Sequence, residues 1–391
     1  MLTRFRDRHH QQFPPGADKL KSLTEHWQIP VWELPLDTRN RIPSLDGLRA
    51  ASLACVLLAH LSGTRHFFRW EMFEIYGNFG VRVFFVISGY LITTLLLKEQ
   101  EKTGGISLRK FYARRAFRIL PAAYVFMIVV ITAQWHTLSW SDMLAAITYT
   151  SNYHQGGNWI VGHLWSLSVE EQFYLLWPML LLLFFRKRLW IVSGMLLSGP
   201  PLRVLFWMLW GHRGLEHPFP VVMDALAAGC ALAMLQPQLK SWDGWLRSRW
   251  FVLVPLLTAL LPLIQLRSNR IYQVAGLTVM HVGIALSIQH AARMQYRVLN
   301  WGPVAWVGTL SYSFYLWQQP FVNRGSQAWW TAFPQNLVLA LFFAAASYYG
   351  VERPFLDLRE RRQERNGPGG VGAGKKAPAK QAAEHVAARV A

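Results

Sequence analysis

The chain has 391 residues, of which 52% are hydrophobic and only 16% are charged, and it carries a formal net charge of +19. Apolar runs recur along almost its whole length, which is typical of a protein that crosses a membrane many times and excludes a soluble globular protein. Both cysteines lie in apolar runs, so no disulfide framework is expected. The first forty or so residues are hydrophilic and lack the apolar core of a cleaved signal peptide, so the first apolar run is expected to direct insertion.

Ten apolar segments can be marked in chain order, and most approach the ~20 residues that a helix needs to cross ~30 Å of hydrocarbon. The sequence therefore predicts an all-α, polytopic membrane protein with about ten transmembrane helices, in a transmembrane domain over residues 44–356. Residues 1–43 are predicted to form a cytoplasmic N-terminal tail, and residues 357–391 a disordered cytoplasmic C-terminal tail. The predicted spans are 44–62, 77–97, 119–135, 164–185, 189–210, 219–236, 250–266, 272–290, 303–322 and 335–350.

Lys and Arg are distributed unequally among the segments that join these spans. With the N-terminus inside, the inner segments hold 31 of these residues and the outer segments 6, while Arg49, Arg82 and Arg203 account for the rest of the 40. By the positive-inside rule, both termini are predicted to be cytoplasmic. Orientation and attraction to anionic lipid explain the net charge, so nucleic-acid binding is not expected.

The first span carries two ionisable side chains, Arg49 and His60, and such groups are costly in a bilayer and often functional. They stand 11 residues apart, about three helical turns and 20° of rotation, so both lie on nearly one face, ~16 Å apart along the axis. Arg49 lies in the inner third of the span and His60 near its outer end. Either side chain could instead extend to the nearest headgroups and have no other role.

The fourth span begins with GHLWSLSVEEQFYLLWP, residues 162–178. Steps of three and four residues place a polar and aromatic set on one helical face, namely His163, Ser166, Glu170, Tyr174 and Trp177. Glu171 points elsewhere, toward Ser168. Glu170 could orient His60 and raise its basicity, but both glutamates could also be surface carboxylates in a first helical turn.

Residues 109–121, RKFYARRAFRILP, form the densest basic cluster, on the inner side of the third span. Arg114, Arg115 and Arg118 are spaced so that their guanidinium groups could grip phosphate groups together. The same cluster could serve only to orient the span in the membrane. In the second span, the Ser-Gly pair at residues 88–89 predicts a close approach of two helix backbones.

Taken together, these stretches resemble the membrane acyltransferase-3 family, bacterial enzymes that O-acylate sugars and other acceptors outside the cytoplasm. The family's Arg-x10-His motif matches Arg49 and His60, and its R-x-x-R motif matches Arg115 and Arg118. The glutamate of its W-S-L-S-V-E element matches Glu170. The stretches that carry the resemblance are SLDGLRAASLACVLLAH, GNFGVRVFFVISGYLIT, FYARRAFRILPAAY, HLWSLSVEEQFYLLWP, MDALAAGCALA, GTLSYSFYLWQQP and VERPF.

The resemblance implies an O-acyltransferase, in particular an O-acetyltransferase, in the bacterial inner membrane. It implies that acetyl-CoA or another short acyl-CoA donates from the cytoplasm and that a hydroxyl group of a cell-surface or exported carbohydrate accepts. No tightly bound cofactor and no metal are expected. The implied catalytic residues are His60, Glu170 and Arg49. The implied donor-binding residues are Arg114, Arg115 and Arg118, and the implied acceptor-binding residues are Trp165, Ser166, Ser168 and Tyr174.

Two positions depart from the pattern of many relatives. Gln318 stands where they carry His, and Met223 stands where they carry Arg before the aspartate that is Asp224 in this chain. No proton transfer is therefore assigned to position 318. His60 is expected either to take the proton from the acceptor hydroxyl or to carry the acyl group as an acyl-imidazole.

A second class of function stays open on the sequence alone. Arg49, His60, Glu170 and Asp224 could form the proton relay of a transporter or flippase. The basic cluster at residues 109–121 favours the enzyme. Inverted repeats, which are typical of many transporters, are not evident in the sequence.

Overall fold

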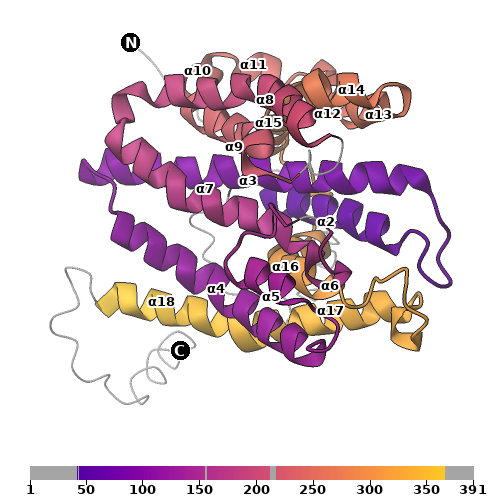
Figure 1. Cartoon of the computed structure of the whole chain (residues 1–391). Coiled ribbons are helices and arrows are strands. Elements are labelled where there is room, and N and C mark those ends of the chain that lie inside the picture. The colour runs from indigo at the N-terminus through magenta and orange to yellow at the C-terminus, as the bar shows by residue number, and fades with distance from the viewer. Residues whose placement is uncertain (1–41, 43, 155, 212–216, 366–391) are drawn as a thin grey trace, which may run out of the picture. The chain divides into compact units, whose positions relative to one another are not determined.

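The computed structural model describes residues 42, 44–154, 156–211 and 217–365, and every regular element in that part of the chain is a helix. The long helices run beside one another (Figure 1), and the all-α prediction is confirmed. They are α2 (Leu45–Leu61), α3 (Glu71–Thr103), α4 (Leu108–Ala133), α7 (Leu164–Leu183), α8 (Arg188–Trp210), α9 (Phe219–Met234), α15 (Leu277–Met294), α16 (Gly302–Gln318), α17 (Gln335–Ser347) and α18 (Arg353–Arg365). Shorter helices are α5 (Trp140–Ile147), α6 (Trp159–Gly162), α10 (Gln236–Ser241), α11 (Asp243–Leu246), α12 (Leu253–Leu260), α13 (Ile264–Arg267) and α14 (Asn269–Ile271).

Each of the ten predicted spans overlaps a helical stretch. Five stretches are long and apolar enough to cross a membrane, and the shorter α9 is also apolar. A multi-pass membrane protein is thus supported, while the number ten stays a prediction, because the other described stretches fall short of that length or apolarity. The five stretches are Glu71–Thr103, Leu108–Ala133, Phe185–Trp210, Arg249–Arg267 and Asn269–Met294.

The helix α4 begins earlier than the predicted third span. Its first residue is Leu108, and the hydroxyl of Ser107 caps it by accepting from the backbone amide of Lys110. The whole basic cluster at 109–121 therefore stands on one helix rather than on a loop. This matters for function because helical spacing fixes which arginines share a face.

The helix α18 extends past the predicted end of the transmembrane domain. It includes residues 357–365, which the sequence analysis placed in the C-terminal tail. The rest of that tail, 366–391, lies outside the described residues, as does the predicted N-terminal tail except for residue 42.

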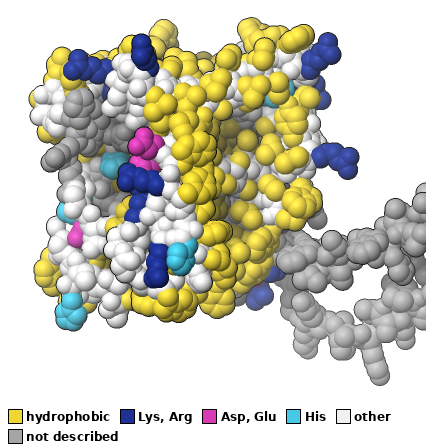
Figure 2. Space-filling model, turned by 90° about the vertical axis from the view of Figure 1, so that its right-hand side faces the viewer, with side chains coloured by type: hydrophobic (Ala, Val, Ile, Leu, Met, Phe, Trp, Pro, Cys, Tyr) yellow, Lys and Arg dark blue, Asp and Glu magenta, His cyan; other side chains and the backbone are white. Residues whose placement is uncertain are grey.

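The bundle has two ends that can be told apart by their connections. The α3–α4 connection, residues 104–107, marks the basic end, and the α2–α3 connection, residues 62–70, marks the loop end. Figure 2 looks onto the loop end, where hydrophobic side chains run down the middle of the face, acidic side chains lie to their left, and basic side chains lie on both sides. Large aromatic side chains are exposed along the connections of this end, including Phe68, Trp70 and Trp329. Aromatic rings in such a position are typical of a membrane–water interface.

Helices α3 and α9 touch through their backbones. A Cβ atom at Gly89 would lie 2.0 Å from the carbonyl oxygen of Leu226, and one at Gly229 would lie 2.1 Å from the carbonyl oxygen of Val86. No other residue fits at either position, so the two glycines set the distance between these helices. The predicted close approach at residues 88–89 is confirmed.

A buried ionic set joins α8, α9 and α15. Asp224 accepts hydrogen bonds from Arg203 at 2.5 Å and from Thr278 at 2.6 Å, and His281 Nδ1 lies 3.1 Å from the same carboxylate oxygen. Arg203 also donates to the carbonyl oxygen of Val221 at 3.0 Å. The three ionisable side chains are at most 2% exposed. Because loss of one partner would leave a buried charge unpaired, this set holds the three helices in register.

Helices α2, α16 and α17 pack around an apolar cluster. Its buried members are Leu53, Leu57, Phe314, Ala340 and Ala344. The two alanines leave room for α17 to lie close against the larger side chains of its neighbours. This packing brings the last turn of α16 beside the last turn of α2.

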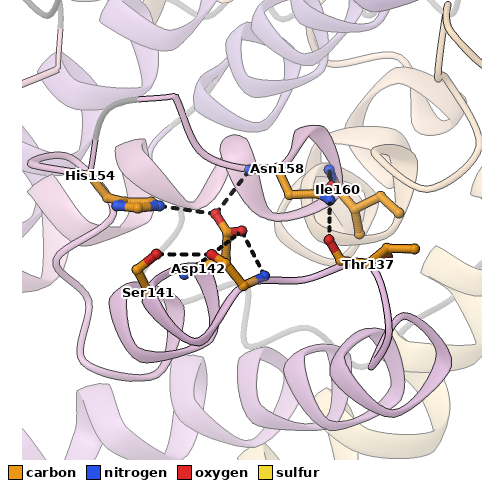
Figure 3. A network of polar contacts seen from close by, with 7 residues as sticks. Thr137, Ser141, Asp142, His154, Asn158 and Ile160 are labelled. Carbon is orange, nitrogen blue, oxygen red and sulfur yellow. Dashed lines mark hydrogen bonds and ion pairs between the residues drawn. The ribbon is translucent and has the colours of Figure 1, made fainter.

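The connection from α4 to α7 is folded around the carboxylate of Asp142 (Figure 3). Asp142 forms a capping box with Ser139 at the start of α5. It also accepts from the backbone amide of Asn158 at 2.9 Å and lies 3.0 Å from Nε2 of His154. Asn158 directly precedes Trp159, the first residue of α6. The carboxylate therefore anchors the start of α6 to α5.

Candidate active site

Glu170 and Tyr174 lie one turn apart on α7 and share a partner on α3. The hydroxyl of Ser88 donates to Glu170 Oε1 at 2.6 Å and lies 2.7 Å from the hydroxyl oxygen of Tyr174. The guanidinium carbon of Arg115, on α4, stands 5.3 Å from the centre of the Tyr174 ring. The helical face predicted for Glu170 and Tyr174 is confirmed, and α3, α4 and α7 meet at it.

Arg49 on α2 lies near the same carboxylate. Its Nη1 atom donates to Oδ1 of Asp46, one turn earlier on α2, at 3.0 Å. The charges of Arg115 and Arg49 both act on Glu170. The carboxylate of Glu170 attracts both guanidinium groups, so it offsets part of the positive charge that the arginines bring to this level of the bundle.

A second carboxylate, Glu352, ends the π-helical turn η7 (Tyr348–Glu352) that follows α17. Its side chain is buried, and it accepts from the hydroxyl of Ser313 at 3.0 Å. The charges of Arg118 and Arg49 both act on it. Sequence reasoning gave Glu352 no role, although a lone carboxylate directly after an apolar run is a signal that could have found it.

The arginines of the basic cluster differ in what they contact. Arg114 donates to Glu99 at 2.8 Å, and the other carboxylate oxygen of Glu99 accepts from the backbone amide of Ser107. This pair closes the α3–α4 connection, so the guanidinium group of Arg114 is already bound to a carboxylate. Arg118 is exposed and makes no hydrogen bond or ion pair with any described residue. Of Arg114, Arg115 and Arg118, Arg118 is therefore the one that is both exposed and without a hydrogen bond to the described residues, so its guanidinium group is open to an anion.

Two of the predicted acceptor-binding residues serve the packing of α7. Ser168 is fully buried, and its hydroxyl donates to the carbonyl oxygen of Leu164 in its own helix at 2.9 Å. The hydroxyl of Ser166 lies 2.6 Å from that of Tyr315 and so joins α7 to α16. Neither serine hydrogen-bonds to His60.

Trp165 lies on a different face of α7, beside α3. Its ring stacks on His217 with the ring centres 4.3 Å apart. The guanidinium carbon of Arg82, a buried side chain, stands 5.9 Å from the ring centres of both Trp165 and Phe85. Trp165 therefore belongs to an aromatic and cationic group distinct from that around Glu170. Of the four predicted acceptor-binding residues, only Tyr174 is brought into contact with the predicted catalytic ones.

His60, near the end of α2, is held by α16 rather than by α7. Its Nδ1 atom lies 2.8 Å from Oε1 of Gln318, the last residue of α16, and its ring meets the ring of Trp159 edge-on with the centres 5.3 Å apart. No described residue forms a hydrogen bond with its Nε2 atom. The predicted contact between Glu170 and His60 is wrong, because Glu170 faces α3 and α4 while His60 faces α16 and α6.

Two polar groups therefore lie along one helix, ~16 Å apart between Arg49 and His60. The arginine cluster comprises Arg49, Arg115, Arg118, Glu170, Tyr174 and Glu352. The His60 group comprises His60, Gln318 and Trp159. Sequence reasoning missed both partners of His60, although a Gln side chain that is fully buried at the end of an apolar helix needs a polar partner. Among the described residues, no three His, Cys, Asp or Glu side chains are arranged to hold a metal ion.

A helical bundle with several helices long and apolar enough to cross a membrane defines a polytopic membrane protein. Residues 42–351 match the profile of the acyltransferase-3 family, an acyltransferase domain. The chain therefore belongs to this family. No solved structure is significantly similar to it.

Two curated relatives show what the chain is similar to. It is 30% identical over 360 residues to the peptidoglycan O-acetyltransferase OatA of Listeria monocytogenes serovar 1/2a (strain ATCC BAA-679 / EGD-e), covering 81% of this chain and 55% of that protein. It is 29% identical over 364 residues to a provisionally named peptidoglycan O-acetyltransferase, YrhL, of Bacillus subtilis (strain 168), covering 80% and 54%. The chain thus spans about half the length of these relatives.

Proposed function

We propose that this chain is an integral-membrane O-acyltransferase, and specifically an O-acetyltransferase. It moves the acyl group of cytoplasmic acetyl-CoA, or of another short acyl-CoA, to a hydroxyl group of a cell-surface or exported carbohydrate. Family membership and the activity in the relatives' names support this proposal. The observation that carries it is the pair of polar groups along α2, with arginines at one level and an imidazole at another, about 16 Å away.

In this proposal, the basic end and both termini face the cytoplasm of a bacterial cell, and the loop end faces the outside of the inner membrane. The distribution of Lys and Arg supports this orientation. Residues 136–163, in the α4–α7 connection, contain no Lys or Arg but several Trp, Asn and Gln side chains. Such a surface suits a carbohydrate, which binds through hydrogen bonds and aromatic faces.

The arginine cluster binds the phosphate groups of coenzyme A. Guanidinium groups form paired hydrogen bonds to phosphate oxygens, and Arg118 is exposed for that purpose, while Arg115 is held against Tyr174. Glu170 positions Arg115 and Arg49, and it does not orient His60. The long, flexible pantetheine arm of the donor then carries the thioester along α2 toward the His60 group.

At the His60 group, the acceptor hydroxyl gives its proton to Nε2 of His60 while its oxygen attacks the carbonyl carbon of the thioester. The carbon–sulfur bond breaks, and the proton passes from the imidazolium to the departing sulfur as coenzyme A leaves. The products are the ester and free coenzyme A, and His60 is returned neutral. General-base help of this kind is typically worth ~10²–10⁴-fold in rate.

The test is acyl transfer from radiolabelled acetyl-CoA by the purified protein in lipid vesicles. Mass spectrometry of cell-surface glycans from cells with and without the gene would identify the acceptor. We expect an acetylated glycan only where the gene is present, and His60→Ala should lose ~10²–10⁴-fold in turnover while insertion is unchanged. Acetyl-CoA that stays intact in the vesicles, together with identical glycans in both cell types, would refute the proposal.

A proton-coupled transporter or flippase is the second candidate. The buried Asp224, His281 and Arg203 favour it, because ionisable groups inside a membrane often carry protons. Against it, the carboxylate of Asp224 is already bound by Arg203 and Thr278, as in a structural ion pair. Proton flux into vesicles without acyl-CoA would favour the transporter, and acyl transfer without such flux would favour the enzyme.

A further inference from the structure

The partner of His60 is itself held by a chain of hydrogen bonds. Nε2 of Gln318 donates to Oε1 of Gln319 at 3.0 Å. Nε2 of Gln319 donates to the backbone carbonyl oxygen of Trp159 at 2.8 Å. The indole Nε1 of Trp159 donates in turn to the carbonyl oxygen of Gln319 at 3.2 Å, so the first residue of α6 is bound to the end of α16 twice.

This chain has only one consistent direction. A backbone carbonyl can only accept, so the amide nitrogen of Gln319 must face Trp159 and its amide oxygen must face Gln318. That oxygen needs a donor, so the nitrogen of Gln318 faces Gln319 and its oxygen faces His60. The last oxygen can only accept from Nδ1. The proton of a neutral His60 therefore belongs on Nδ1, and the lone pair on Nε2.

We infer that Gln318 and Gln319, anchored on the carbonyl group of Trp159, fix the tautomer of His60 so that Nε2 is the basic nitrogen. The amide side chains are 0% and 2% exposed, so no bulk water can satisfy them in a reversed orientation. Either flip would place two acceptors or two donors face to face, which is unfavourable where nothing else can pair with them.

The assignment of the tautomer does not depend on the proposed function, but the catalytic role given to it does. Gln318 is then a positioning residue, which holds the imidazole ring and leaves Nε2 open to the acceptor hydroxyl. A neutral amide does this without adding a charge beside the imidazole. Two other ionisable groups in the described chain interact electrostatically with His60. They are His163, at the start of α7, and Arg324, after α16. Neither hydrogen-bonds to its Nδ1 atom.

The first experiment reads the tautomer without reference to activity. Nitrogen NMR of the full-length protein labelled at histidine would assign the His60 signals by their loss in His60→Gln. We expect a neutral ring protonated at Nδ1 in the parent protein and a mixture of both tautomers in Gln319→Met. Gln335→Met, at the exposed start of α17, is the matched control and should leave the signals unchanged. A parent His60 protonated at Nε2, or signals unchanged in Gln319→Met, would overturn the inference.

The second experiment uses transfer kinetics. Gln318→Met should lower kcat by about tenfold or more, but by less than the ~10²–10⁴-fold expected for removal of the base, and it should leave the KM for acetyl-CoA unchanged. Gln318→Glu keeps the acceptor, so it should keep the tautomer and move the acid limb of the kcat–pH profile to higher pH. An unshifted acid limb in Gln318→Glu contradicts a link to His60. An Nδ1-protonated ring in a protein without transferase activity would uphold the inference and reject the proposed function.

Discussion

Replacement of Arg115 by alanine is the most direct perturbation of the arginine cluster. The guanidinium group of Arg115 stands over the Tyr174 ring, and its charge acts on Glu170. A hydrogen bond between a guanidinium and a phosphate contributes ~1.5–3 kcal/mol. Since ~1.4 kcal/mol corresponds to a factor of ten in affinity, Arg115→Ala should weaken the binding of coenzyme A by about 10- to 150-fold.

Lysine at the same position should restore only part of this affinity. It keeps the charge, but it cannot form the planar fork that pairs with two phosphate oxygens, and it stacks less well on an aromatic ring. We therefore expect Arg115→Lys to fall between the parent protein and Arg115→Ala. Arg109→Ala is the matched control, because Arg109 is an exposed arginine in the first turn of the same helix.

The assay is calorimetric titration of coenzyme A into each purified variant, with thermal unfolding measured in parallel. Binding loss without a matching fall in the unfolding temperature assigns the effect to the donor site. Parent-like affinity in both Arg115→Ala and Arg118→Ala would refute the reasoning and leave the cluster with a role in membrane orientation only. Equal losses in Arg109→Ala would show that net charge, not position, governs binding.

Three further predictions concern Glu171, Asp142 and the orientation in the membrane. Glu171→Gln should leave transfer activity within about twofold and should not lower the unfolding temperature, because Glu171 Oε1 is buried with no hydrogen-bond partner among the described residues. Burial alone would raise the pKa of Asp142, but hydrogen bonds from Ser139, Asn158 and His154 outweigh it and hold the pKa below its ordinary value. A lowered folded pKa stabilises the protein above the unfolded pKa of about 4, so Asp142→Asn should lower the unfolding temperature most at neutral pH, and the difference should shrink as the pH falls through the folded pKa. A reporter fused after residue 160 should be active only outside the cytoplasm and one after residue 245 only inside, and the reverse at either point would refute the orientation.

Sequence periodicity predicted those parts of the structure that depend on one helix at a time. The helical stretches, the shared face of Glu170 and Tyr174, and the backbone approach at Gly89 all follow from spacing or residue size within a single element. The start of α4 at Leu108 was missed because the residues after it are basic, and a search for apolar runs passes over them. The helical conformation of residues 357–365 was missed for the same reason, because most of these residues are charged.

The parts of the site that depend on how two helices meet were not predictable from spacing. His60 was assigned Glu170 as a partner because both are polar residues in apolar spans. The structure instead places Gln318 at its Nδ1 atom, because α2 packs against α16 through Leu53, Leu57 and Phe314. The relative rotation and depth of packed helices are set by side-chain volumes on both partners, and no periodicity within one helix contains that information.

The placement of Glu170 leads to a last prediction that separates the two polar groups. The charges of Arg115 and Arg49 both act on the carboxylate of Glu170, which also accepts from Ser88 at 2.6 Å. This negative charge therefore stabilises the positive charge of the arginine cluster. Glu170→Gln removes the charge but keeps an oxygen for Ser88, so both arginines should lose this attraction and the KM for acetyl-CoA should rise by about tenfold.

The pH dependence of turnover decides between this role and the one expected from the sequence. A carboxylate that oriented His60 would, when neutralised, shift the acid limb of the kcat–pH profile and leave the KM for the donor alone. A carboxylate that holds the arginines would do the reverse. Ser88→Ala is the matched control, because it removes the hydrogen bond to Glu170 but not the charge, and it should raise the KM by less than Glu170→Gln does. A shifted acid limb with an unchanged KM in Glu170→Gln would return Glu170 to the His60 group, against the contacts of α7 with α3 and α4.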